Sequence, residues 1–410
     1  MAGATRTTAD ATLQEDYQPM VREQINNDIP LLTYAEKRST DVDGRRAVLA
    51  LHTGRNEGVG ARAEGGTLPT AGKQAWAEQR VPVYYNYGRG TISGPLLKSA
   101  DKNSASFVNA LDAETTMITN DLKRDVNRQL WGTSNGVIAE LAQTTNSVVV
   151  NLLSTATEVQ FDQLQVGMAV DIGTVAAPTG TTSNNEIAAT GGSAGAYTVT
   201  LTTACTTTLS TYIFRTGSGG DTANTSQKEL TGVQTIVDSA GTLFNVNPST
   251  YPVWKSSEFG NSGTNRAISE NLMIQVVHDI NRKSGTWPNM AVASYGVQRA
   301  FAAHLMSTKR HVNTVDLTGG YSKGISFVAG GGNEIPVVID RDCPANSMYF
   351  FNTKHLFEYQ MCDWEFMDDD GAILSRVSNT DAYEFTLRKY HEFATDRRNA
   401  HGKLTDITEA

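Results

Sequence analysis

The residues of this chain that could do chemistry form several motif-like patterns, and none of the patterns is complete. The stretch GKQ around Lys73 resembles the end of a phosphate-binding loop. However, Thr67 stands where the first glycine of that loop belongs, and no Ser or Thr follows the lysine. The stretch GNSGT, residues 260–264, resembles a nucleophile elbow, but Thr264 replaces its last glycine. Neither pattern predicts a phosphate site or a nucleophilic serine.

Patterns that could hold a metal ion or a dinucleotide are also incomplete. No pair of histidines has the HExxH spacing, and His278 is predicted to be a structural histidine on a helix. The acidic run 368–370 has Asn379 where a calcium loop needs a bidentate carboxylate, so a solvated hairpin turn is expected. Glycines 330–332 lie between two predicted strands, which excludes a dinucleotide fingerprint. We therefore expect no catalytic residue, no cofactor and no metal ion, and a protein that is not an enzyme.

Composition narrows the class of protein further. The 410 residues can form two or three cores, and the net charge of -9 argues against tight, sequence-independent DNA binding. Three cysteines (Cys205, Cys343 and Cys362) show no metal-binding spacing and are predicted to be free thiols. The N-terminus lacks the apolar core of a signal peptide, and no apolar run is long enough to span a membrane.

The elements that surround these residues begin with a polar segment, 1–45, which is interrupted by Pro19 and Pro30. A glycine-rich stretch, 46–93, follows. It starts as a short apolar strand and returns through alternating residues from Trp76 to Ile92, which predicts a long two-stranded arm. Such an arm has little of its own chain to pack against. We therefore interpret it as a structure that reaches a neighbouring subunit.

The clearest periodicity follows this arm. Apolar residues recur at steps of four or seven between 101 and 132, which predicts one amphipathic helix of about 28 residues and roughly 42 Å. Its predicted core face consists of Phe107, Leu111, Ile118, Leu122, Val126 and Leu130. The opposite face carries Asp125 and Arg128, which we expect to be solvated or to face a polar neighbour. This helix is interpreted as a spine of the fold.

The stretch 145–216 is rich in Thr, Ser, Gly and Val and has almost no Lys or Arg, which predicts a small antiparallel β-barrel or sandwich inserted into its parent domain. Its expected core residues are Phe161, Leu164, Val166, Met168, Val170 and Ile172. Residues 230–339 then predict mixed α+β structure, with helices capped by Ser269 and Ser294. The strands predicted at 348–351, 355–360, 364–367, 373–377 and 383–393 are placed beside the spine helix.

This order of elements resembles the major capsid protein of a tailed double-stranded DNA bacteriophage, which has the Hong Kong 97-type coat fold. The stretches AEGGTLP, at 63–69, and AYEFTLRKYHEFATDRRNAHGKL, at 382–404, carry the resemblance, which covers roughly 1–144 and 230–410. The resemblance implies an α+β fold with a small antiparallel β domain inserted. It assigns 1–45 to an N-terminal arm, 46–93 to the extended loop, 94–132 to the P domain with the spine helix, 133–340 to the A domain with the insertion, and 341–410 to return strands of the P domain and the C-terminus.

The resemblance also implies partners and a location. The chain would form homo-pentamers and homo-hexamers of an icosahedral shell that encloses DNA without sequence-specific contact. Its extended loop would contact a neighbour through Arg62, Glu64, Lys73 and Trp76. Further partners would be a portal protein, a separate scaffolding protein and a decoration protein, in a virion assembled in the host cytoplasm. Two alternatives stay open, an encapsulin-like cellular shell of the same fold and a β-rich adhesin.

Covalent cross-linking of subunits is a further property of some relatives of this fold, which join a lysine of the extended loop to an asparagine of the P domain. The candidates here would be Lys73 and Asn379. An amide is a poor electrophile, and no motif specifies the desolvated lysine and positioned carboxylate that the reaction needs. We expect Lys73 to be a solvated charge or an ion-pair partner across subunits.

Overall fold

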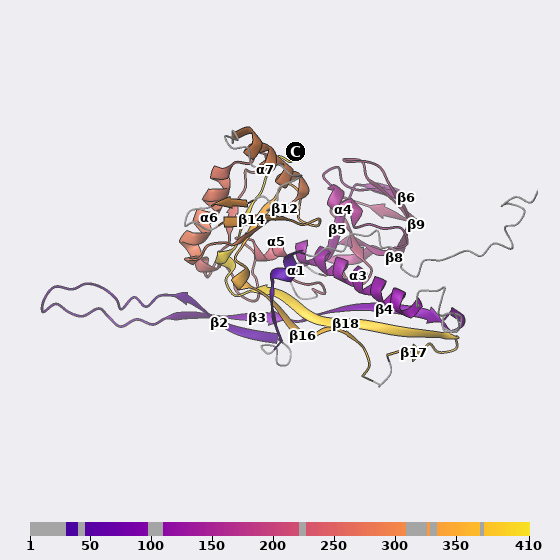
Figure 1. The fold of residues 1–410 in the computed structure, drawn as a ribbon, viewed down its shortest axis with the longest axis horizontal. Coiled ribbons are helices and arrows are strands. Elements are labelled where there is room, and N and C mark those ends of the chain that lie inside the picture. The colour runs from indigo at the N-terminus through magenta and orange to yellow at the C-terminus, as the bar shows by residue number, and fades with distance from the viewer. Residues whose placement is uncertain are drawn as a thin grey trace, which may run out of the picture. The chain divides into compact units, whose positions relative to one another are not determined.

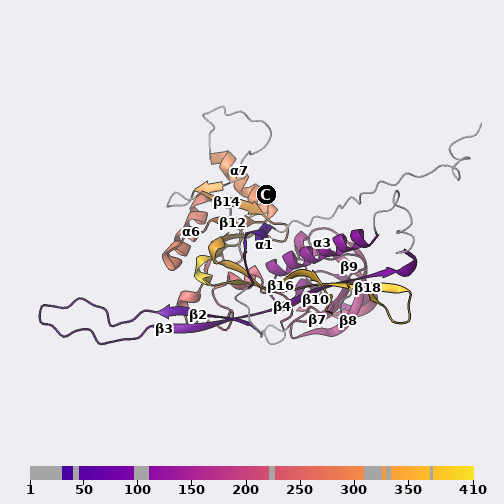
Figure 2. The same ribbon diagram turned by 60° about the horizontal axis from the view of Figure 1, so that its bottom comes forward.

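The computed structural model describes residues 30–39, 46–96, 110–220, 227–308, 326–328, 334–369 and 373–410. The chain divides into two compact units. Figures 1 and 2 show the helices and strands of which they consist. The described parts of the first unit fall within Tyr87–Arg124 and Trp364–Arg388. Those of the second fall within Asp28–Asn86, Asp125–Asp363 and Lys389–Ala410. Most of the predicted N-terminal arm and the first turns of the predicted spine helix lie outside the described residues.

A five-stranded sheet has the order β1–β16–β18–β17, with β4 also paired to β18. Its strands are β1 (Glu36–Arg38), β4 (Tyr84–Ser93), β16 (Leu356–Phe366), β17 (Ser375–Arg376) and β18 (Ala382–Thr395). In the first unit, Leu122 of helix α3 (Ala110–Trp131) packs on this sheet. A Cβ atom at Gly88 of β4 would lie 2.5 Å from the leucine Cδ1, and one at Gly90 would lie 2.5 Å from Cζ of Phe385. Glycine at these positions lets both side chains pack directly on the strand backbone.

The second unit contains a mixed six-stranded sheet with the order β11–β19–β15–β12–β14–β13. The strands are β11 (Ser257–Phe259), β12 (Met290–Ala293), β13 (Ser326–Val328), β14 (Glu334–Ile339), β15 (Met348–Phe351) and β19 (Gly402–Leu404). Helices α6 (Glu270–Ser284) and α7 (Tyr295–Thr308) pack on it around Val277, Phe301 and Phe350. Both predicted caps are present, since Ser269 Oγ accepts from Leu272 N at 3.4 Å and Ser294 Oγ accepts from Val297 N at 3.3 Å.

A second six-stranded sheet, wholly antiparallel, has the order β5–β10–β7–β8–β9–β6. Its strands are β5 (Val137–Leu141), β6 (Thr144–Asn151), β7 (Ala169–Thr174), β8 (Ala177–Gly191), β9 (Thr198–Thr207) and β10 (Thr211–Arg215). The two outer strands also meet, because Ala142 N donates to Asn151 O and Leu153 N donates to Glu140 O, both at 2.9 Å. The sheet therefore closes into a barrel.

The barrel confirms the inserted β domain and corrects two details of it. It begins at Val137, before the predicted boundary at 145, because β5 supplies a wall strand. Leu164, Val170 and Ile172 are buried in its core, with Phe161 packed against them. Val166, predicted to lie in that core, is 64% exposed, because it lies in the turn that precedes β7.

The shorter elements connect these parts. They are α1 (Pro30–Tyr34), α4 (Glu158–Asp162), α5 (Val233–Ile236) and the 3-10 helices η2 (Pro252–Trp254), η3 (Thr353–His355) and η4 (Arg398–Ala400). Strand β1 pairs in parallel with β16, so the end of the predicted N-terminal arm belongs to a sheet.

Two predictions for the C-terminal strands are wrong. The predicted strands 355–360 and 364–367 form one continuous strand, β16. Residues 348–351, predicted to join the sheet that supports the spine helix, form β15, which pairs with β12 and β19 in the other sheet. The strand still contacts the end of α3, because the rings of Tyr349 and Trp131 lie 5.3 Å apart. All four β15 residues are buried, and their continuous apolar run is typical of a strand covered on both faces.

Candidate assembly surfaces

The most distinctive surface of the second unit is a two-stranded hairpin. Strand β2 (Arg46–Gly54) pairs with β3 (Ala75–Pro82) in antiparallel register, from Arg46 opposite Pro82 to Gly54 opposite Ala75. Residues 55–74 connect them without a helix or strand, and Figure 1 shows this loop extending away from the other elements of the unit. Most of the hairpin therefore packs against none of the described cores.

The four predicted contact residues of the arm are all exposed on this hairpin. Arg62 is held locally, since its Nε donates to Thr67 O at 3.1 Å. Glu64 and Lys73 lie in the connecting loop, and Trp76 on β3 is 61% exposed, with its ring 5.1 Å from that of His52. The structure thus places these side chains on one element and leaves them open to solvent. Their contact with a neighbour stays a prediction.

The foot of the hairpin is fixed firmly to the second unit. Val81 is fully buried, and the buried amide of Gln79 donates from Nε2 to Thr395 O at 2.7 Å. Arg80 N donates to Phe244 O at 2.9 Å. These contacts set the direction of the arm.

The return strand ends earlier than predicted. Pairing with β2 ends at Pro82, and the residues from Tyr84 to Ser93 form β4, which pairs with β18. Proline has no backbone N–H to donate to a ladder, so a change of partner at this residue interrupts no hydrogen bond of its own. The predicted arm of 46–93 is therefore a hairpin of 46–82 followed by a sheet strand.

The spine helix confirms part of its predicted core face. Val126 and Leu130 are buried at 1% and 0% exposure, whereas Ile118 and Leu122 are half-buried. Phe107 lies outside the described residues, and the side chain of Leu111 is not among those described. Burial increases toward the C-terminal end of the helix, whose residues from Asp125 onward belong to the second unit.

The polar face of this helix end is buried in a charge network that the sequence did not reveal. Arg128 pairs with Asp125 at 3.0 Å and, through two nitrogens, with Glu229, while Arg215 of the barrel pairs with Asp125 at 2.7 Å. Burial alone would raise the pKa of Asp125, but the two guanidinium groups outweigh it and lower that pKa. Of the two arrangements predicted for Asp125 and Arg128, the structure shows contact with polar neighbours and not exposure to solvent.

A second buried polar cluster joins β18 to β16 and β4. Glu358 accepts from Lys389 Nζ and from His391 Nδ1, both at 2.7 Å, and all three side chains are at most 1% exposed. Asn86 Nδ2 lies 3.0 Å from His391 Nε2, and burial lowers the pKa of this histidine. A neutral ring that donates from Nδ1 and accepts at Nε2 satisfies both neighbours. Nothing in this enclosed cluster is open to a substrate.

The residues of the rejected chemical motifs have structural roles. Asp406 Oδ2 accepts from the backbone N–H of Asn261 and of Gly263, which closes the 260–264 turn. His278, predicted to be a structural histidine on a helix, is exposed on α6 and packs edge-on against Trp287. The three cysteines are free thiols. Within the described residues, no group of His, Cys, Asp and Glu could hold a metal ion, and no helix is long and apolar enough to cross a membrane.

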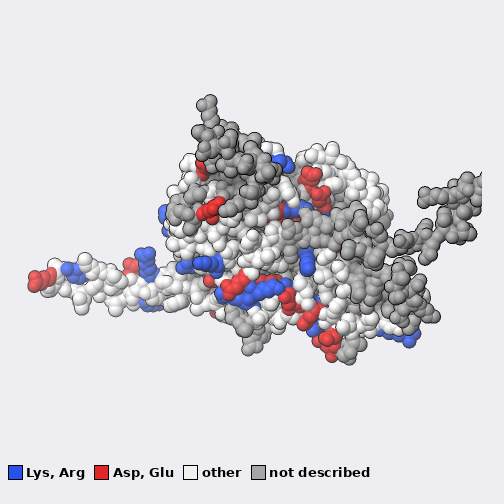
Figure 3. All heavy atoms as spheres, in the orientation of Figure 1, with Lys and Arg blue, Asp and Glu red and all other residues white. Residues whose placement is uncertain are grey.

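Charge is mixed on the drawn face of the molecule. Figure 3 shows both acidic and basic side chains along the hairpin, with white, uncharged surface between them. No extended field of one sign covers the part of this face that is described. The hairpin therefore offers paired charges and apolar surface together.

Similarity searches connect this architecture to solved structures, although the sequence matches no family model and no curated protein. It is similar in structure to the capsid asymmetric unit of cyanophage A-1(L), with 16% identity and a TM-score of 0.62, over 99% of this chain and 100% of that chain. The chain has the Hong Kong 97-type coat fold. It is also similar to the capsid of a native GTA particle, with 11% identity and a TM-score of 0.55, over 99% of this chain and 100% of that chain.

The elements described above for this fold are a hairpin, a long helix and three larger sheets. The α+β class predicted from the sequence is confirmed, and so is the inserted antiparallel domain. At 16% and 11% identity, what this chain shares with the two capsids is the fold.

Proposed function

We propose that this chain is a structural major capsid protein of a tailed double-stranded DNA bacteriophage. In this role it assembles through pentamers and hexamers into an icosahedral shell around the genome, and it is not an enzyme. The observation that carries the proposal is the hairpin, whose large apolar side chains lie outside any described core. Val48, Leu68 and Trp76 are 57%, 82% and 61% exposed. Apolar surface of this kind is typical of a site that another protein covers.

A closed shell needs such an element. Its subunits meet in rings through different surfaces, and extended arms bury area across neighbours without a larger monomer core. The similarity in fold to the two capsids supports this use of the arm. We further propose the domain layout given by the resemblance, with three changes. The barrel begins at Val137, strands β15 and β19 belong to the sheet of the A domain, and the contact hairpin is narrowed to β2–β3. Arg62, Glu64, Lys73 and Trp76 are proposed to lie at the contact.

The proposed partners follow from the same role. They are further copies of this chain, a portal protein, a separate scaffolding protein, a decoration protein and the packaged DNA, which is enclosed without sequence-specific contact. The net charge of -9 fits weak contact between wall and DNA. The proposed location is the virion, after assembly in the host cytoplasm.

Negative-stain electron microscopy of the purified chain tests the proposal. We expect rings, shells or tubes from the full chain. Deletion of residues 64–73 should leave the circular dichroism spectrum unchanged and impair closed shells, because this stretch packs in none of the described cores. Normal particles from the deletion variant would contradict the role of the arm. A full chain that stays monomeric would contradict the proposed function, and shells that enclose protein cargo and no DNA in the producing cell would support the encapsulin alternative.

A further inference from the structure

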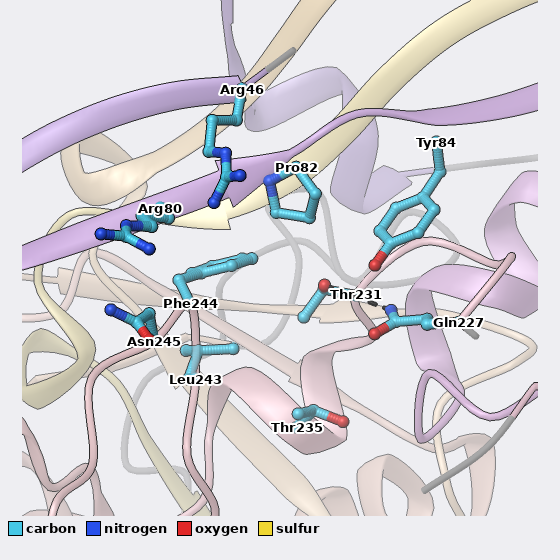
Figure 4. A pocket seen from close by; sticks show the side chains of 10 residues that line it. All are labelled: Arg46, Arg80, Pro82, Tyr84, Gln227, Thr231, Thr235, Leu243, Phe244 and Asn245. Atoms are coloured by element: carbon cyan, nitrogen blue, oxygen red, sulfur yellow. Dashed lines mark hydrogen bonds between the residues drawn. The ribbon is translucent and has the colours of Figure 1, made fainter. Parts of the chain in front are cut away.

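A pocket of about 310 Å³ opens at the foot of the hairpin (Figure 4). One wall comes from the hairpin and the strand that follows it, with Arg46, Arg80, Pro82 and Tyr84. The other wall comes from the 227–245 segment, with Gln227, Thr231, Thr235, Leu243, Phe244 and Asn245. All ten residues belong to the second unit, so this site is complete within one compact body.

The polar groups of the pocket favour an anion. Figure 4 shows the guanidinium of Arg46 and the hydroxyl of Tyr84 directed into the space between the walls. Arg80 pairs with Glu78 through two nitrogens, at 2.8 and 3.1 Å, whereas Arg46 has no hydrogen-bonded acceptor among the described residues. Glu78 also attracts Arg46. Among the described residues, two cations therefore face one nearby anion, which leaves an excess of one positive charge.

The apolar groups and the size of the pocket restrict the ligand further. Phe244, Leu243 and Pro82 can cover a short aliphatic stem next to the charged group. A volume of this size accepts a side chain or a small molecule, but not a DNA duplex. Guanidinium groups bind planar carboxylates through two parallel hydrogen bonds. A carboxylate on a methylene stem matches both parts of the lining.

The pocket is preformed. Leu243 and Val246 exchange two backbone hydrogen bonds, of 3.1 and 2.9 Å, around a tight turn. Its central residues, Phe244 and Asn245, have φ of 49° and 70°, a region that an aromatic residue rarely occupies. Arg80 N holds the same turn through Phe244 O at 2.9 Å. These contacts hold Phe244 in its positive-φ conformation, so the wall that it forms keeps its shape without a ligand.

We propose that this pocket binds a carboxylate side chain of a second copy of this chain, with Arg46 as the charged group that recognises it. The proposal rests on the proposed function, which brings copies together at the hairpin. The chain itself offers an excess of carboxylates, with 43 acidic residues against 34 basic ones. The pocket adjoins the exposed hairpin. A neighbouring copy that contacts the hairpin therefore also lies next to the pocket.

Zero-length coupling tests the contact directly. Shells are assembled from equal amounts of ¹⁴N- and ¹⁵N-labelled Arg46→Lys chain and treated with a water-soluble carbodiimide, which joins an amine to a carboxylate in contact with it. We expect mixed-label peptides that link position 46 to an Asp or Glu of another copy. The unaltered chain, whose guanidinium does not couple, and dissociated subunits are the controls, and both should lack this product. Coupling within one copy only, or none at position 46 while other lysines couple, would overturn the proposal.

Assembly equilibria measured without DNA distinguish a carboxylate from a DNA phosphate as the ligand of the pocket. In DNA-free shells, Arg46→Gln should raise the free subunit concentration at equilibrium about tenfold, as expected for the loss of about 1.4 kcal/mol per contact. The matched variant Arg55→Gln removes the same charge from the hairpin outside the pocket and should have a smaller effect. Unchanged assembly of Arg46→Gln combined with weaker DNA retention would assign the pocket to phosphate and refute the proposal. Failure of the unaltered chain to assemble would refute only the proposed function.

Discussion

Glu392 on β18 is a fully buried carboxyl group whose ionisation we expect to set the pH dependence of stability. Its Oε1 accepts from Thr231 N and Phe393 N, both at 2.8 Å, and its Oε2 lies 3.2 Å from Thr231 Oγ1. Burial outweighs these three hydrogen bonds and raises the pKa of Glu392 from 4.5 to about 8. The folded protein therefore holds a proton at neutral pH that the unfolded chain releases.

The sign and the size of the effect follow from this difference. Between pH 4.5 and about 8, the folded state binds more protons than the unfolded state, so the free energy of unfolding falls as the pH rises. The slope is about 1.4 kcal/mol per pH unit, which gives a loss of at most about 5 kcal/mol across the interval. Above pH 8 the group is ionised in both states and the contribution becomes constant.

The variant Glu392→Gln removes this titration and keeps the contacts. The amide oxygen can accept both backbone hydrogen bonds, and the amide nitrogen can donate to Thr231 Oγ1. We expect the variant to match the parent chain within about 1 kcal/mol at pH 5. At pH 8.5 it should be more stable than the parent by about 2–5 kcal/mol, because it avoids a buried anion.

Urea unfolding of dissociated subunits, followed by tryptophan fluorescence at pH 5, 7 and 8.5, measures these values. The control Glu186→Gln changes an exposed glutamate on β8 and should stay within about 0.5 kcal/mol of the parent at each pH. The comparison of variant with parent cancels the other titrating groups, His391 included. A constant difference between Glu392→Gln and the parent at all three pH values would refute the argument.

Four further predictions concern the spine helix, its charge network, the barrel and the loop. Leu130→Ala should cost about 2–5 kcal/mol in urea unfolding and Lys123→Ala about 0.5 kcal/mol or less, and equal losses would contradict the helical phase. Arg128→Ala should cost about 3–5 kcal/mol because it leaves two buried carboxylates without their main partner, and a loss below 1 kcal/mol would show that they are solvated. Residues 137–215 expressed alone should give a β-type circular dichroism spectrum and a cooperative melt, whereas a disordered spectrum would show that the barrel depends on the rest of the chain. Shells boiled in detergent with reductant should run as one monomer band, since Lys73 is exposed in its loop; a ladder that disappears in Lys73→Ala would instead establish cross-linking.

Local sequence patterns predicted most of the elements and several caps. Helix α6 could be predicted because its start at Ser269, its apolar spacing and its end at Gly285 are all local signals. The strands of the barrel could be predicted for the same reason. Alternating Thr and Val, separated by turn residues, define strands without reference to distant parts of the chain. The exposed arm followed from glycine content and from the absence of core residues. These features depend on short-range geometry, which the sequence specifies directly.

Only the tertiary structure decided which strand pairs with which and which charges are buried. Residues 76–92 were predicted to form one return strand, yet their partner changes at Pro82, and this choice depends on β18, which lies some 300 positions further along the chain. Asp125 and Arg128 look like an ordinary solvated helix face until Glu229 and Arg215 enclose them. The pocket beside Arg46 likewise needs the 243–246 turn, whose distance in sequence hides it. Periodicity reports which face of an element is apolar, whereas burial of its polar face depends on partners that no local pattern specifies.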